Sequence, residues 1–151
     1  MMASDMQFTV FDLDERQYGI RLEQVDRIIR AVDATPLPRA PALVLGVIDL
    51  HGELIPVLSV RHRLGTPPRP IGVTDQFMIV RTARRKVALA VDQVREIVAC
   101  TGEAVVPAEA LVPRWKEIAG AVQVKGGVIL IQDLDRFLSL EEDQMLERAL
   151  R

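Results

Sequence analysis

The 151 residues suit one domain with a sizeable core: 49% are hydrophobic but only 4% aromatic, so the core must be mainly aliphatic. The formal net charge of −2 argues against nucleic-acid binding, which usually needs a basic face. A single cysteine excludes an intramolecular disulfide, and we find neither a signal-peptide pattern nor a membrane-length apolar run, so we expect a soluble cytoplasmic protein.

Five strands are predicted in the first half of the chain, from apolar residues that alternate with polar ones or form short runs. They cover residues 7–12, 17–22, 25–31, 46–50 and 53–58. A polar turn at Asp14-Glu15-Arg16 joins the first two strands, and His51-Gly52 forms the hairpin turn of the last two. The proline-rich segment 34–41 cannot be a regular strand or helix.

A linker over about 65–75, rich in proline and glycine, leads to a second half with the same plan. Its predicted strands cover residues 76–81, 86–91, 94–100, 118–124 and 128–132. A short helix is predicted over 133–138. Ser139 and Glu142 then form a capping box that opens a last helix over about 140–150.

The two halves repeat each other in sequence. Residues 7–29 lie over 76–98 at a constant offset of 69, and residues 46–64 lie over 120–138 at an offset of 74. Identical pairs include Gln24/Gln93, Val25/Val94, Ile28/Ile97, Gly46/Gly120 and Gly52/Gly126. A repeat of this kind decides the architecture. We therefore predict a mainly β fold of two five-stranded sub-domains, about 7–64 and 76–138, related by a pseudo-two-fold axis and followed by a short C-terminal helix.

Polar residues offer little chemistry. His51 and His62 lack further ligands at metal spacing, Cys100 has no motif, and no residue set suggests a catalytic site or a cofactor. The basic run from Arg81 to Lys86 is the one feature that favours an alternative, an SH3-like nucleic-acid or other protein-interaction module. Apolar residues that repeat between the halves could line a groove that holds another protein, or they could simply be core; they are Val25, Ile28, Val94 and Ile97.

Several motifs together resemble the CheW family, the adaptors that couple chemoreceptors to the CheA histidine kinase. The strongest is the stretch from Pro41 to Arg61, PALVLGVIDLHGELIPVLSVR, which is similar to the family's G-V-x-N-L-R-G segment and the apolar strand after it. Further matches are Tyr18-Gly19-Ile20, Val91-Asp92-Gln93-Val94, Gly120 and the segment ILIQDLDRFL. The resemblance covers about residues 7–140 and implies a single CheW-like domain, residues 1–151, of two SH3-like β-barrel sub-domains.

The resemblance also implies a non-enzymatic role, without cofactor or metal, at cytoplasmic chemoreceptor arrays. The groove between the sub-domains would bind the helical receptor tip, and one barrel end would bind a CheA-type kinase. The positions that fall in these regions are Val25, Arg27, Ile28, Gly46, His51, Gly52, Val91 and Val94. Neither nucleic acid nor direct membrane insertion is implied.

The chain departs from the family pattern at four positions. Asp49 stands for the Asn of N-L-R-G and His51 for its Arg, while Ser59 replaces an Asp and Arg27 replaces a frequent Glu. That Glu and that Arg can pair in the family, so both members of one ion pair are changed here. We therefore predict that Arg27 and His51 lie near each other and tune partner choice, which favours a dedicated or divergent pathway.

Overall fold

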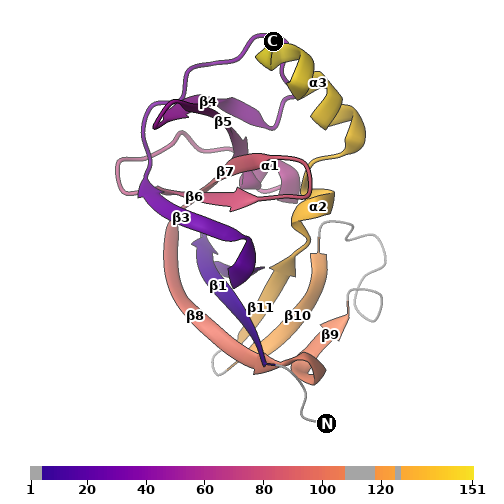
Figure 1. Cartoon of the computed structure of the whole chain (residues 1–151). Helices are drawn as coiled ribbons and strands as arrows, with labels where there is room; N and C mark the ends of the chain where they lie inside the picture. The colour runs from indigo at the N-terminus through magenta and orange to yellow at the C-terminus, as the bar shows by residue number, and fades with distance from the viewer. Residues whose placement is uncertain (1–4, 108–117, 125–126) are drawn as a thin grey trace.

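The computed structural model describes residues 5–107, 118–124 and 127–151, which form two β-sheets and three helices. Sheet A lies in the lower half of Figure 1 and sheet B in the upper half. In order, sheet A contains β8 (Gln93–Thr101), β1 (Asp5–Leu13), β2 (Arg16–Arg21), β11 (Gly127–Gln132), β10 (Ile118–Val124) and β9 (Val105–Pro107). Sheet B contains β3 (Val25–Arg30), β6 (Gln76–Arg81), β7 (Lys86–Val91), β5 (Glu53–Ser59) and β4 (Val44–Leu50). The predicted mainly β fold is confirmed.

The two sheets have the same plan, as the repeat predicts. At the offsets of 69 and 74, the order β3-β6-β7-β5-β4 of sheet B becomes β8-β1-β2-β11-β10 of sheet A. The register agrees as well: Val57 lies opposite Ala88 in the parallel pair of sheet B, and their counterparts, Ile131 and Gly19, lie opposite each other in sheet A. The pseudo-two-fold relation therefore extends to individual residue pairs.

The sheets do not coincide with the two halves of the sequence. Strands β1 and β2 pair with β8 and β11 from the second half, whereas β6 and β7 pair with β3 and β5 from the first. The 3-10 turn at Leu22–Gln24 carries the chain from sheet A to sheet B, and Asp92 carries it back. The predicted sub-domains 7–64 and 76–138 are thus repeats in sequence that exchange their first hairpins in space.

Sheet A has a sixth strand, β9, where we expected five strands in each sheet. In sheet B the corresponding contact is a single bridge between Thr35 and Val47. At both places a glycine admits the neighbouring strand: an added Cβ would lie 2.6 Å from the carbonyl oxygen of Thr35 at Gly46, and 2.6 Å from that of Val106 at Gly120. The identical glycines therefore repeat because each one allows a close backbone approach.

Replacing Gly120 with alanine should lower the free energy of unfolding by about 2–3 kcal/mol, because the new methyl group would overlap a backbone carbonyl that cannot rotate away. Urea unfolding would measure this loss. Gly102→Ala is the matched control, since its Cβ would meet only the Met6 sulfur, at 3.5 Å. Equal stability of the two variants would contradict the close-approach explanation.

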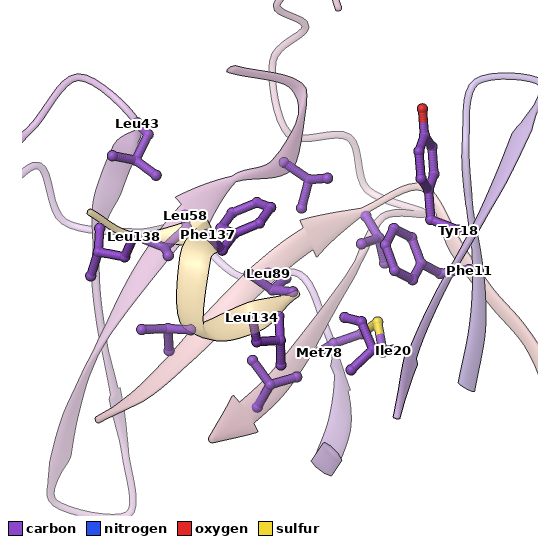
Figure 2. Close-up of a cluster of buried hydrophobic side chains, with 14 of the residues drawn as sticks. Phe11, Tyr18, Ile20, Leu43, Leu58, Met78, Leu89, Leu134, Phe137 and Leu138 are labelled. Carbon is purple, nitrogen blue, oxygen red and sulfur yellow. The ribbon is translucent and has the colours of Figure 1, made fainter. Parts of the chain in front are cut away.

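Among the residues that the structure describes, three apolar clusters form the core. Two of them are related by the repeat: Phe77, Ile79 and Val57 lie in the sheet B cluster, and their counterparts Phe8, Val10 and Ile131 lie in the sheet A cluster. The third, which we call the central cluster, joins the two sheets and the helices (Figure 2). It includes Phe11, Tyr18, Ile20, Leu58, Met78, Leu89, Leu134, Phe137 and Leu146. Burial of this cluster holds the two sheets together.

The helices pack on this central cluster. The unpredicted α1 (Val60–Leu64) follows β5, and α2 (Leu134–Phe137) is its counterpart after β11. The capping box predicted for α3 (Leu140–Leu150) is present, with both the Ser139 and the Glu142 hydrogen bonds. Leu146 is fully buried and docks α3. Within the described residues, each helix is too short or too polar to span a membrane.

Candidate protein-interaction surface

Two equivalent strands from different sheets meet the central cluster. Val25 on β3 and Val94 on β8 are both half-buried and pack against it. Three residues further along each strand, Ile28 is 40% exposed and Ile97 is 55% exposed. We call these four residues the inter-sheet face. Val25 and Val94 share the central cluster, and each strand also exposes an apolar side chain of the kind that anchors protein interfaces.

A pocket of about 480 Å³ lies beside Val94. Arg30 at the end of β3, Val73 of the linker, and Asp92 and Gln93 at the start of β8 also line it. Val73 is 93% exposed, which is unusual for a large apolar side chain. The inter-sheet face is therefore hollowed next to one of its four residues and bordered by a further apolar side chain.

An ionic network holds the two sheets in place beside this pocket. Arg61, only 8% exposed, donates to both carboxylate oxygens of Asp14, at 2.8 and 2.9 Å, and to Asp92, at 2.9 Å. The backbone N–H of Asp14 donates to Asp92 at 2.6 Å. Arg69 of the linker binds Asp92 at 2.6 Å and Asp75 at 3.0 Å. Because Asp14 turns the β1–β2 hairpin of sheet A and Arg61 follows β5 of sheet B, the network ties the sheets to each other.

The network lowers the pKa of both shared carboxyl groups. The hydrogen bond from Arg61 is the largest cause of the lowered pKa of Asp14. Burial alone would raise the pKa of Asp92, but hydrogen bonds from the Asp14 backbone and from Arg61 and Arg69 outweigh burial and lower it. Both groups are therefore charged over the whole physiological range, and the network stays intact there.

The sequence did not single out Arg61 as a structural residue. The sequence did contain a signal for it. Arg61 closely follows a predicted apolar strand and ends one motif of the family resemblance, and Asp92 belongs to another. Other predicted site residues also take structural places. Val91 is 2% exposed and lies at the end of β7, so its side chain offers almost no surface to a partner. Gly46 is buried against Thr35, whereas Gly52 is exposed in the β4–β5 turn.

Near β3 the charged side chains of Asp26, Arg27, Lys86 and Glu53 form a row, which we call the charge row. Arg27 lies 3.7 Å from Asp26, and Lys86 lies 3.6 Å from Asp26 and 3.7 Å from Glu53. The row thus runs from β3 to the hairpin whose turn carries His51, which is exposed. In sheet B, β3 and β4 form opposite edges. The proximity of Arg27 to His51 stays a prediction, and Lys86 is a member of this region that sequence reasoning missed.

The basic run in the β6–β7 hairpin is largely engaged within the protein. Arg85 binds Asp143 at 2.7 Å and Glu147 at 2.9 Å on α3, and Lys86 belongs to the charge row. Salt-dependent binding of phosphates needs uncompensated cations. The alternative of a nucleic-acid module therefore loses two of the four charges that supported it.

Comparison with known proteins agrees with the fold and the motifs. The model of the CheW-like domain family matches residues 7–142. The chain is 28% identical to the chemotaxis protein CheW of Treponema pallidum over 154 aligned residues, covering 97% of this chain and 91% of that one. It is also 28% identical to CheW of Rhizobium meliloti, covering 87% and 86%. The crystal structure of the scaffolding protein TtCheW from Thermoanaerobacter tengcongensis superposes with a TM-score of 0.83 at 25% identity, covering 93% of this chain and 96% of that one.

Two equivalent β-sheets packed around a shared core define this protein as a paired β module. The chain belongs to the CheW-like domain family, whose model spans most of its length.

Proposed function

We propose that this protein is a non-enzymatic adaptor that couples chemoreceptors to a CheA-type histidine kinase in a chemotaxis or chemotaxis-like pathway. The observation that carries the proposal is the inter-sheet face, an exposed apolar surface on a fold shared with chemotaxis proteins and with a scaffolding protein. Such an adaptor would reside in the cytoplasm and be recruited to receptor arrays at the membrane.

The receptor tip, a helical hairpin, would bind across the inter-sheet face. A helix that lies in a groove presents apolar anchors at positions i, i+3, i+4 and i+7. Ile28 and Ile97 project from strands of different sheets and would contact such a helix from two sides. The half-buried Val25 and Val94 would form the base of the contact.

The kinase would bind at a different, polar surface, the barrel end that includes the β4–β5 turn. His51 and Gly52 are exposed there, and the charge row ends at Glu53. Exposed charges govern specificity and association rate more than affinity. The departures at Arg27 and His51 would therefore select a particular kinase rather than strengthen binding in general.

Co-purification would test the adaptor role. The tagged full chain should retain both a CheA-type kinase and a chemoreceptor cytoplasmic fragment from the same genome, and should raise the amount of kinase that sediments with receptor. An excess of untagged protein should compete with the tagged protein for both partners. Retention of neither partner by a folded chain would contradict the proposal.

A further inference from the structure

A second pocket, of about 410 Å³, lies at the end of sheet A and has no part in the surfaces described above. The ends of β2 and β11 and the starts of β1, β9 and β10 surround it. We call it the Gln132 pocket. Its lining includes Met6, Glu23, Ala119, Gln132, Asp133 and Asp135.

Gln132 is an unusual residue for this place. It is 2% exposed, and neither its amide oxygen nor its amide nitrogen has a hydrogen-bond partner among the described residues. The equivalent position in sheet B holds Leu58, which packs in the central cluster. Buried amides are almost always paired, because an unpaired one is costly. A buried amide that takes the place of leucine, with no partner among the described residues, indicates a ligand group from another molecule.

The equivalent place in the other half of the molecule borders the pocket beside Val94, which Asp75 and Asp92 also line, and it holds an arginine of the linker. There the extended linker of the chain is held by Arg69, whose guanidinium binds Asp75 and Asp92. The counterparts of these two aspartates at the offset of 69 are Met6 and Glu23, and both line the Gln132 pocket. The Gln132 pocket is therefore the counterpart of the Asp75–Asp92 site, which binds an arginine of the linker.

In the first half of the repeat the linker follows Leu64, but no linker follows its counterpart, Leu138. Beyond Leu138 the chain enters α3, which forms ion pairs with Arg63 and Arg85 on the sheet B side. The charge of the pocket also differs from that of its counterpart. Asp135 takes the position of Arg61. Among the described residues that line the pocket, Glu23, Asp133 and Asp135 are acidic and Arg21, which lies 2.8 Å from Glu23, is basic. Asp133 also lies 3.5 Å from Arg136, outside the lining. The described lining therefore carries more acidic than basic side chains, which favours binding of a cation.

We propose that the Gln132 pocket binds an extended, arginine-bearing segment of a partner protein. The guanidinium pairs with Glu23 and the acidic rim, as Arg69 pairs with Asp92 in the other half. The backbone of the segment supplies the donor and acceptor that the Gln132 amide lacks. This site is separate from the inter-sheet face and does not depend on the proposed adaptor function.

A labelled peptide that copies the linker, residues 66–73 (TPPRPIGV), is a suitable probe of the full-length protein, because it carries the arginine in its observed extended context. Fluorescence anisotropy should show saturable binding with millimolar or better affinity. The same peptide with alanine in place of arginine should bind at least 10-fold more weakly. Gln132→Leu should weaken binding at least 10-fold while Tm stays the same or rises, since leucine is the residue that the equivalent position buries.

Glu23→Gln provides a second variant that should fold normally, because Glu23 is exposed, and it should also weaken binding. Glu15→Gln, which makes the same change of charge in the β1–β2 turn, is the matched control and should bind as the wild type does. Absence of saturable binding, full binding by Gln132→Leu or Glu23→Gln, or equal binding of the alanine peptide would each overturn the proposal.

Discussion

Ile97→Asp is expected to reduce binding of a chemoreceptor helical hairpin at least about 30-fold, the effect of losing a contact worth about 2 kcal/mol. Ile97 projects from β8 and is 55% exposed, so the free protein gains little by burying it. In the proposed complex it would be an apolar anchor, and a carboxylate there would have to be desolvated without a partner. Isothermal titration with a receptor cytoplasmic fragment would measure the change.

Val128→Asp is the matched control for Ile97→Asp, because Val128 lies on β11 of the same sheet and is 53% exposed. Both variants place aspartate on a strand, so both should lose about 1 kcal/mol of stability or less. Only Ile97→Asp should lose receptor binding. Normal binding by a folded Ile97→Asp protein would remove β8 from the receptor site.

Val94→Asp, by comparison, changes a residue that packs against the central cluster. It should weaken receptor binding and lower the stability together. Val94 is one of the site residues predicted from the sequence, but Ile97 is the better probe because it is 55% exposed.

Arg61→Ala should lower the free energy of unfolding by about 2–3 kcal/mol, less than the loss of a fully buried ion pair because Asp14 is half-exposed. The change removes the side chain that joins sheet A to sheet B and leaves Asp14 and Asp92 facing each other. Urea unfolding at neutral pH would measure the loss. Arg69→Ala should cost less, because Arg69 is 39% exposed and binds carboxylates that Arg61 or backbone groups also hold.

The effect of Arg61→Ala should depend on pH in a defined direction. The pKa values of Asp14 and Asp92 are lowered in the folded protein, so their contribution is fully present above the unfolded pKa of about 3.9. It is lost as pH falls through the lower folded pKa values. The stability difference between wild type and variant should therefore be constant above about pH 5 and shrink below pH 4. A difference that persists unchanged at lower pH would show that packing, rather than charge, causes it.

The sequence by itself determined the local structure, because strands, turns and caps depend on neighbouring residues. Alternation of apolar residues located ten strands, with ends that differ from the observed ones by no more than two residues. The His51-Gly52 turn adopts positive φ at both residues, and the Ser139 capping box forms. The repeat also gave the pseudo-two-fold plan, since equivalent apolar patterns build equivalent core clusters.

Only the tertiary structure decided which hairpin joins which sheet. The hairpins β1–β2 and β6–β7 have equivalent patterns, so either one fits the same place beside β5 or β11, and local preferences cannot choose between them. Long-range pairing places β2 beside β11 and β7 beside β5. The exchange brings Arg61 to Asp14 and Asp92, and Gln132 lies beside a pocket without a partner in the part of the chain that the structure describes. These features depend on contacts between residues far apart in the chain, which no local pattern records.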